Sequence, residues 1–444
     1  MSHTPLRLRA PIALPCDDSC TVVRDAVVDV LSDGMIGYVG TAAGAPHWIG
    51  ESRTLTGILL PGLVNTHAHS AMSVLRGRGG DLPLMDWLRN AMWPAEAMMT
   101  PADIGDGMLL GSVEMLRNGV TTSVEMYFHT EELIEAVTAT GARAVLAEAI
   151  LDRPFGTPWE ETVDDIGARM DRCGLRCGPD GRIELAYGPH SAYVLPPEAL
   201  RVIGEEAARR GALVHIHVAE TATEDVPQRA AFGSVPQLLD SLGLTGGRLL
   251  AAHAVHLSRR DIAVFADRGV GVAHCPSSNA KLASGIAPLA ELRRAGVRVG
   301  LGTDGPASND RLDLLEEART AALSARLNAA DPLALSAADA LLMATRRGAE
   351  ALGRTDIGAL ETGRAADIVH LSVDHPAFAT GLDVPDEELI ANLVWAAGSR
   401  TVTDVWVAGE RVVAAGEPTL VDRATAQARV AAAAARLRSS EVGG

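Results

Sequence analysis

Short apolar runs alternate with segments of helical periodicity through the middle of the chain, from about residue 61 to 352. Short runs rich in Val, Leu, Ile and Ala are typical of buried strands, and apolar residues at every third or fourth position are typical of helices. The runs predict eight strands, at 63–66, 121–125, 143–148, 183–188, 213–217, 249–253, 271–275 and 297–303. The longer segments predict helices that include 103–117, 131–140, 197–210, 258–268 and 287–295.

Eight strands with helices between them predict a (β/α)8 barrel, in which the chemistry lies at the carboxyl ends of the strands. The alternative is an open, doubly wound sheet. No Gly-x-Gly-x-x-Gly turn opens the first strand–helix unit, which weakens a dinucleotide-binding interpretation. We therefore expect a barrel catalytic domain over residues 61–352.

Both ends of the chain show a different pattern, with short apolar runs separated by Gly, Asp and Ser. Such runs are typical of short antiparallel strands. We expect residues 1–60 and 353–444 to pair into one small β-sandwich domain around the continuous middle. The Ala-rich stretch 424–438 predicts a terminal helix.

The composition narrows the range of partners and locations. The chain has 444 residues, 47% of them hydrophobic, and a formal net charge of −17. That charge argues against nucleic acid or an anionic membrane as a partner. The first fifteen residues lack a signal-peptide pattern, and no apolar run is long enough to span a bilayer. A cytoplasmic enzyme is the expectation.

Two histidines mark the end of the first predicted barrel strand. His67 and His69 are two residues apart after an apolar run. Side chains at positions i and i+2 of a strand lie on the same face, so both rings can reach one divalent metal. The alternative is a pair of ordinary polar residues in a loop.

Further metal ligands are predicted at the ends of other strands. His217, on the fifth strand, is the natural third imidazole, and Asp304, at the end of the eighth, is the natural carboxylate. In a closed barrel the first and eighth strands are neighbours, which brings Asp304 beside His67 and His69. Three His and one Asp can hold Zn2+ with an open position for water, whose pKa the metal lowers. The fourth strand end has no Lys that could bridge a second metal, so we expect one metal per chain.

Proton transfer needs further groups near such a metal. Glu220, three residues after His217, can donate a proton to a ring nitrogen and then to a leaving amine. The alternative is a surface Glu in a loop. His253 can orient the attacking water or be a structural histidine, and His256 competes for its role. His215 alternates with His217, and we expect only one of the two to face the barrel interior.

These residues lie in stretches that resemble the amidohydrolase superfamily. The stretches are 61–69 (PGLVNTHAH), 217–220 (HVAE) and 301–305 (LGTDG). They resemble the branch of cytosine deaminases, guanine deaminases and triazine hydrolases and, within it, the 5′-methylthioadenosine/S-adenosylhomocysteine deaminases. Supporting stretches are 81–88 (DLPLMDWL), 93–96 (WPAE), 188–191 (GPHS) and 279–288 (NAKLASGIAP).

The resemblance implies a zinc-dependent hydrolytic deaminase of an adenosine-type nucleoside and a homo-oligomer, a dimer or tetramer. It implies His67, His69, His217 and Asp304 as ligands, with Asp304 also accepting the proton of the water. Glu220 is implied to protonate purine N1 and His253 to steady the tetrahedral centre. The substrate contacts that the resemblance implies are Glu96 for the ribose hydroxyls, His190 for the purine, and Trp87 on a loop covering the pocket.

One position departs from the pattern of relatives that bind a carboxylate-tailed nucleoside. Such relatives can use an Arg at the end of the third strand, where this chain has Glu148. Arg153, just downstream, could supply the contact instead, or Glu148 could pair with a neighbouring Arg and play no role in substrate binding. The candidate substrates are 5′-deoxyadenosine, methylthioadenosine, adenosine and S-adenosylhomocysteine. The alternatives are another heterocycle (guanine, a pterin, a triazine) or a specialised pathway nucleoside such as aminodeoxyfutalosine.

Overall fold

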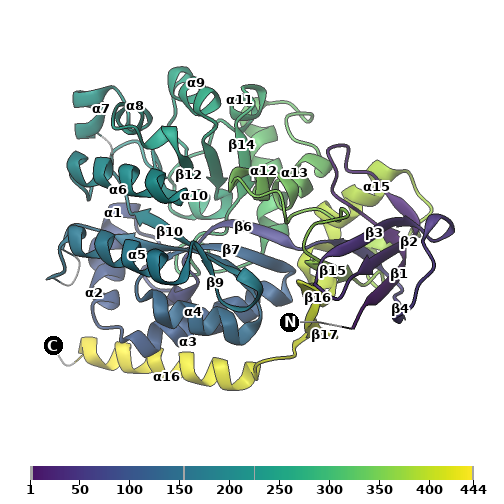
Figure 1. Ribbon diagram of the computed structural model, residues 1–444. Coiled ribbons are helices and arrows are strands. Elements are labelled where there is room, and N and C mark those ends of the chain that lie inside the picture. The colour runs from purple at the N-terminus through teal and green to yellow at the C-terminus, as the bar shows by residue number, and fades with distance from the viewer. Residues whose placement is uncertain (1–3, 154–155, 225, 443–444) are drawn as a thin grey trace.

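A closed barrel of parallel strands forms the larger part of the computed structural model, which describes residues 4–153, 156–224 and 226–442 (Figure 1). Each strand pairs in parallel with the next, and the last pairs with the first through Leu301 and Asn65. This closure confirms the (β/α)8 barrel and excludes the open sheet. The strands in order are β6 (Leu63–Ala68), β7 (Val120–Tyr127), β8 (Arg143–Ile150), β10 (Ile183–Pro189), β11 (Leu213–Val218), β12 (Arg248–His253), β13 (Gly271–His274) and β14 (Arg298–Leu301). The short β9 (Arg176–Cys177) pairs antiparallel with β10.

Helices surround the barrel, and their ends follow local sequence signals. The Thr100 side chain caps α3 in a reciprocal pair with Asp103, and Ser258 caps α9 in the same way with Asp261. The helices are α1 (Leu84–Trp87), α2 (Trp93–Glu96), α3 (Pro101–Arg117), α4 (Thr130–Thr140), α5 (Trp159–Cys173), α6 (Pro197–Arg210), α7 (Val226–Phe232), α8 (Val235–Ser241), α9 (Arg259–Arg268), α10 (Pro276–Lys281), α11 (Leu289–Arg294), α12 (Leu314–Ala329), α13 (Ala337–Met343) and α14 (Arg346–Ala351).

The two ends of the chain form a second sheet beside the barrel, as Figure 1 shows at its right side. The antiparallel pairing of β5 with β15 joins strands from the two ends of the chain in one sheet. The pairing of β1 with β4 and β5 is parallel, in contrast to the expected antiparallel arrangement. The strands are β1 (Leu6–Ala13), β2 (Val23–Val30), β3 (Ile36–Thr41), β4 (Glu51–Thr54), β5 (Ile58–Pro61), β15 (Ile368–Leu371), β16 (Val402–Val407), β17 (Glu410–Ala414) and β18 (Glu417–Pro418).

The barrel and the second sheet meet at a buried ion pair and at the single residue Gly62. Arg143, at the start of β8, binds Asp367 through two hydrogen bonds of 3.0 and 3.1 Å, and both side chains are buried. Gly62 alone separates β5 from β6. A Cβ atom at Gly62 would lie 2.0 Å from Oγ1 of Thr121, so a larger residue cannot fit there without a shift.

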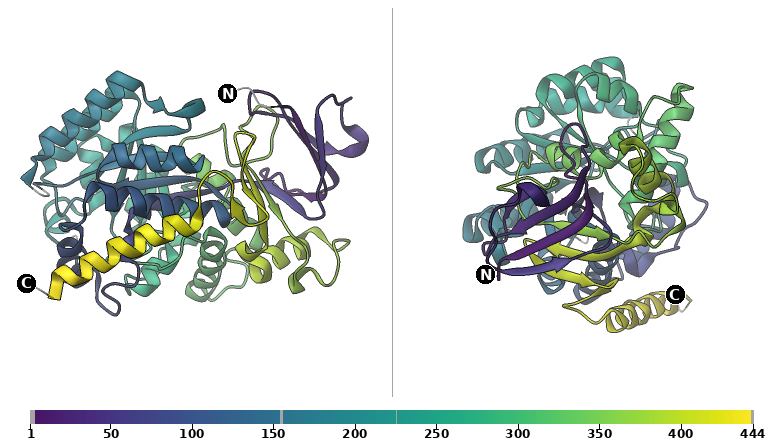
Figure 2. Two further views of the ribbon diagram at one scale, coloured as in Figure 1. Left: turned by 90° about the horizontal axis from the view of Figure 1, so that it is seen from below. Right: turned by 90° about the vertical axis from the view of Figure 1, so that its right-hand side faces the viewer.

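The predicted terminal helix is α16 (Arg423–Val442), which runs along the barrel (Figure 2). It packs beside α3, and Val430, Ala433 and Leu437 are buried there. Near the outer sheet lies the shorter α15 (Asp386–Ala391). Among the described residues, no helix is both long and apolar enough to cross a membrane.

Candidate metal and active site

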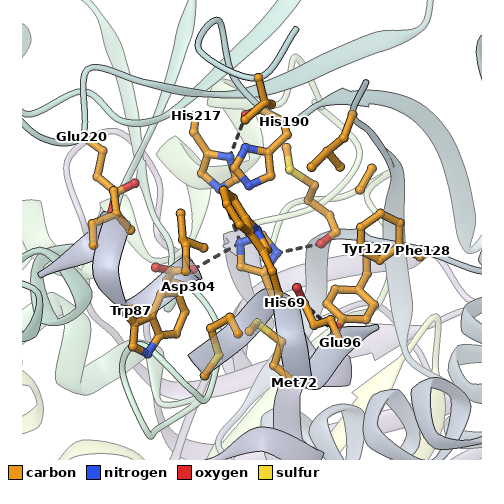
Figure 3. A pocket seen from close by; sticks show the side chains of 18 of the residues that line it. His69, Met72, Trp87, Glu96, Tyr127, Phe128, His190, His217, Glu220 and Asp304 are labelled. Carbon is orange, nitrogen blue, oxygen red and sulfur yellow. Dashed lines mark hydrogen bonds and ion pairs between the residues drawn. The ribbon is translucent and has the colours of Figure 1, made fainter. Parts of the chain in front are cut away.

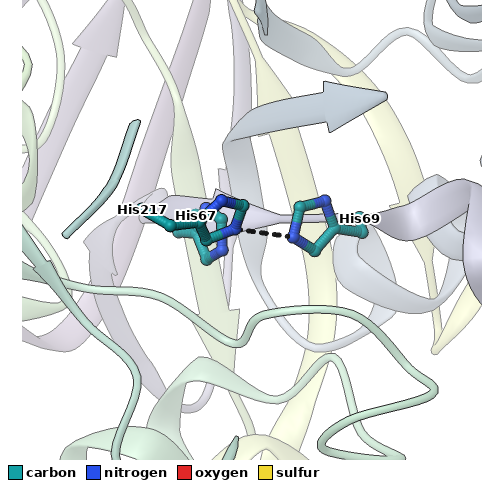
Figure 4. A group of neighbouring side chains, drawn as sticks. All are labelled: His67, His69 and His217. Carbon is teal, nitrogen blue, oxygen red and sulfur yellow. Dashed lines mark hydrogen bonds between the residues drawn. The ribbon is translucent and has the colours of Figure 1, made fainter. Parts of the chain in front are cut away.

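Three histidines meet at the carboxyl ends of β6 and β11. Nε2 of His217 lies 3.4 Å from Nε2 of His69 (Figure 4), and the ring centroids of His67 and His69 are 4.6 Å apart. The ring nitrogens of His67, His69 and His217 lie within 4.8 Å of one another. The strand-end positions predicted for these residues therefore converge on one point.

The other ring nitrogen of each histidine has a hydrogen-bond partner. Nδ1 of His69 lies 2.6 Å from the carbonyl oxygen of Met126, and Nδ1 of His217 lies 2.7 Å from that of His190. A carbonyl only accepts, so both Nδ1 atoms carry the proton and both Nε2 atoms are left with a free lone pair. This tautomer is the one that a metal ligand needs.

His67 reaches the same tautomer through another histidine. Nδ1 of His215 lies 3.1 Å from the carbonyl oxygen of Leu250, so its Nε2 is the acceptor for Nδ1 of His67 at 2.7 Å. Nε2 of His67 is buried and has no hydrogen-bond partner among the described residues. Burial lowers the pKa of His67 to about 3, which keeps the ring neutral.

Asp304 completes the cluster. Its Oδ1 lies 3.5 Å from Nε2 of His67 and 3.3 Å from Nε2 of His69. Ser278 Oγ donates to Oδ2 at 2.6 Å, and the Gly305 N–H donates to Oδ1 at 2.7 Å. Burial alone would raise the pKa of Asp304, but the neighbouring imidazoles of His67, His69 and His253 hold that pKa well below the usual range.

These donors fit a divalent metal. Three imidazoles whose ring nitrogens lie together and one neighbouring carboxylate are ligand types that Zn2+ takes in catalytic sites. The orphaned Nε2 of His67 is itself a sign of this, because buried polar atoms are normally satisfied. The cluster therefore has the chemistry of a divalent-metal site.

A cavity of about 450 Å3 opens above the cluster (Figure 3). Its walls are mostly apolar, and its polar side chains include the metal cluster, Glu220, Glu96 and Asp152. In Figure 3, Glu220 and Trp87 lie on one side of His69 and Tyr127 on the other. The lining includes His69, Met72, Trp87, Met92, Trp93, Glu96, Tyr127, Phe128, Asp152, His190, Tyr193, His217, Glu220, His253, Leu282 and Asp304.

Glu220 and His253 lie together on the cavity wall. Oε2 of Glu220 is 3.7 Å from Nε2 of His253, and both side chains are buried. Nδ1 of His253 lies 2.9 Å from Oδ1 of Asn279, which leaves Nε2 directed at the cavity side. The competing His256 does not line the cavity, and its Nε2 bonds to the carbonyl oxygen of Ser284.

The three predicted substrate contacts nearest the metal also line the cavity. Glu96, at the end of α2, accepts a 2.9 Å hydrogen bond from the hydroxyl of Tyr127. Burial raises the pKa of Glu96, although this hydrogen bond opposes the shift. Burial lowers the pKa of His190 to about 3, so the ring is neutral. Trp87 ends α1 and is also buried.

Glu148 and Arg153 are not brought to the cavity with the others. The carboxylate of Glu148 accepts hydrogen bonds from Thr130 at 2.7 Å and from Arg169 at 2.6 Å. Glu148 therefore forms a salt bridge with Arg169, as expected under the alternative in which it has no role in substrate binding. Arg153 is exposed and absent from the cavity lining.

The prediction for His215 was wrong. Both His215 and His217 are buried inside the barrel, because residues two apart in a strand lie on the same face. The i, i+2 spacing was the signal that could have shown this. Ser278, Asn279 and Tyr127 were also missed, since their roles depend on partners distant in the sequence.

The comparison with protein families agrees with this site. Residues 58–412, which include the whole cluster, match the amidohydrolase family. The chain belongs to that family. A relative from Pelotomaculum thermopropionicum, named 5-methylthioadenosine/S-adenosylhomocysteine deaminase, is 41% identical over 88% of this chain and 89% of its own length. A relative from Methanosarcina mazei, named 5′-deoxyadenosine deaminase, is 41% identical over 80% of each chain.

Solved amidohydrolase structures show the same fold. An adenosine deaminase from Xanthomonas campestris, crystallised with bound zinc, superposes with a TM-score of 0.91 at 37% identity. The superposition covers 98% of each chain. The barrel and the outer sheet are thus shared along nearly the whole length.

Proposed function

We propose that this chain is a zinc-dependent hydrolytic deaminase that converts an adenosine-type nucleoside to the inosine-type product and ammonia. The observation that carries the proposal is the meeting of a three-His, one-Asp cluster with Glu220 in a cavity that also contains Glu96. The names of the relatives at about 40% identity support the same reaction.

His67, His69, His217 and Asp304 would hold the metal, one ion per chain. When bound, a zinc ion lowers the pKa of a water molecule and so supplies a nucleophile near neutral pH. The unpartnered Nε2 of His67, the carbonyl-bonded Nδ1 atoms of His69 and His217, and the carboxylate of Asp304 held by Ser278 support this assignment.

The remaining residues would transfer protons and orient the substrate. Asp304 takes a proton from the water as oxygen adds to C6 of the purine. Glu220 donates a proton to N1, takes up the proton of the new hydroxyl on C6 and passes it to the amino group, so that C6 keeps a carbonyl oxygen, the C6–N bond breaks and ammonia leaves. The proton held by Asp304 then returns to Glu220, which restores both groups. Nε2 of His253, beside Glu220, hydrogen-bonds the oxygen that adds to C6.

The two ends of the substrate would have separate contacts. Glu96 would accept hydrogen bonds from the ribose hydroxyls, with its carboxylate held by Tyr127. The neutral His190 would contact the purine, and Trp87 would cover it. A carboxylate that binds two hydroxyls favours a nucleoside over a free base, since a base has no ribose.

The test is an absorbance assay of the zinc-loaded protein with adenosine, 5′-deoxyadenosine, methylthioadenosine, S-adenosylhomocysteine, adenine and guanine. We expect turnover of nucleosides and none of the free bases. No absorbance change with any nucleoside, with one equivalent of zinc bound, would overturn the proposal. Turnover of guanine alone would replace it with base deamination. Light scattering on the same sample would test the expected dimer or tetramer.

A further inference from the structure

We propose that Asp152 makes this site selective for nucleosides whose 5′ substituent is uncharged or cationic, and that the site discriminates against a carboxylate-bearing 5′ substituent. The inference rests on the proposed deaminase function and names the substrate class within it. Nothing in the family match fixes this property, since one relative is named for a substrate with a carboxylate and another for one without.

Asp152 lies near the end of the cavity that would hold the ribose. β7 and β8 are neighbours, and Tyr127 pairs with Glu148 in their register. The Tyr127 hydroxyl bonds Glu96, the proposed ribose ligand, and the segment that follows β8 brings Leu151 and Asp152 to the cavity wall. A substituent on C5′ of a ribose held by Glu96 would therefore approach this wall.

The cavity has room for a substituent in that direction. Asp152, Tyr193 and Val194 line both the main cavity and a second hollow of about 460 Å3. The other walls of the second hollow are mostly apolar and include Pro196, Pro227 and Phe232. A methylthio or longer apolar group would be compatible with these surroundings.

The charged side chains along this path are all acidic. Among the described residues that line the two hollows there is no Lys or Arg. Four carboxylates line them: Glu220 and Asp304 near the metal cluster, Glu96 beside Tyr127, and the exposed Asp152. A carboxylate on the substrate would lose water without gaining a cation, and would lie near a like charge.

Arg169 and Arg153 do not change this balance of charge. Arg169 already binds Glu148 and Glu131, at distances of 2.6 and 2.8 Å. Arg153 follows Asp152 directly but does not line either hollow. Asp152 is thus the charge that a 5′ tail would meet.

The experiment uses the zinc-loaded full chain and three nucleosides whose 5′ thioether tails carry no charge, a negative charge or a positive charge. They are 5′-methylthioadenosine, 5′-(carboxymethylthio)-5′-deoxyadenosine and 5′-(2-aminoethylthio)-5′-deoxyadenosine. We expect kcat/KM for the carboxymethyl compound to be at least about tenfold below that for methylthioadenosine, with the aminoethyl compound equal to or above it. The difference should narrow as salt is added, because Asp152 is exposed and screened.

Two variants test whether Asp152 causes this difference in kcat/KM. In Asp152→Asn, the ratio of kcat/KM for the aminoethyl and carboxymethyl compounds should fall by about fivefold or more. Glu148→Gln is the matched control, since it removes an acid four residues away whose carboxylate binds Arg169 outside the cavity. Its ratio should equal that of the parent protein.

The outcomes separate the two proposals. If none of the three nucleosides is turned over, the deaminase function fails and the inference with it. If methylthioadenosine is a substrate and the carboxymethyl compound is equally good, the deaminase function stands and the selectivity is wrong. If Asp152→Asn leaves the ratio unchanged, or Glu148→Gln changes it as much, Asp152 is not the selective residue.

Discussion

Nε2 of His215 lies 2.7 Å from Nδ1 of His67, and this contact fixes the proton of a proposed metal ligand. His215 is itself fixed by the carbonyl oxygen of Leu250. The chain of two bonds leaves Nε2 of His67 free for the metal.

Replacement of His215 should therefore weaken metal binding. We expect His215→Phe to raise the zinc Kd by about 10- to 100-fold, measured by competition with a chelator. His215→Gln, whose Oε1 can accept from His67, should recover part of the affinity. A folded His215→Phe protein with the parent's zinc Kd would contradict the role of His215.

Glu220 should be needed for proton transfer to the substrate and not for metal binding. Glu220→Gln keeps the shape of the side chain but cannot cycle a proton, so kcat should fall by about 10²- to 10⁴-fold. Metal analysis of the same preparation should show an unchanged zinc content. Loss of zinc together with activity would mean that Glu220 supports the metal site instead.

Glu96 should act on nucleoside binding alone. We expect Glu96→Gln to raise KM for methylthioadenosine by about tenfold, because a neutral amide is a weaker acceptor for two ribose hydroxyls. The inhibition constant of adenine should be unchanged. Tyr127→Phe, which removes one donor to Glu96, should have a smaller effect in the same direction.

The buried carboxyl group of Glu317 should make the free energy of unfolding depend on pH. Burial raises the pKa of Glu317 to about 7, against the hydrogen bonds from Ser277 and Asn309 that oppose the shift. A raised folded pKa contributes stability that is fully present below the unfolded pKa, about 4.5, and is lost as the pH rises through about 7.

The matched comparison is Glu317→Gln, which cannot titrate. The Tm of the variant minus that of the parent protein should increase between pH 5 and pH 8, by about 2 °C or more. Thermal unfolding of both proteins should be measured with saturating zinc, so that metal binding contributes equally to the two Tm values. A difference that stays constant over this range would show that Glu317 does not titrate there.

The sequence predicted the barrel well because parallel strands buried on both faces appear as continuous apolar runs. Each of the eight predicted barrel strands overlaps an observed one. The proposed ligands could be named from the sequence because catalytic side chains of a barrel lie at the carboxyl ends of its strands. Hydrogen-bond partners were less predictable. Nothing local in the sequence indicates that Arg169 of α5 reaches Glu148, or that Asn279 reaches His253.

The close packing at Gly62 limits where the chain can be cut to separate the barrel from the outer sheet. The strand that bears His67, and that ends just before His69, follows an outer-sheet strand with one glycine between the two strands. If the chain were cut at this point, the first residues of β6 would no longer be held by β5. The position of β6 along its neighbouring barrel strands would then be less well fixed. Circular permutants should therefore be opened elsewhere, and a minimal catalytic fragment should carry the outer sheet with it.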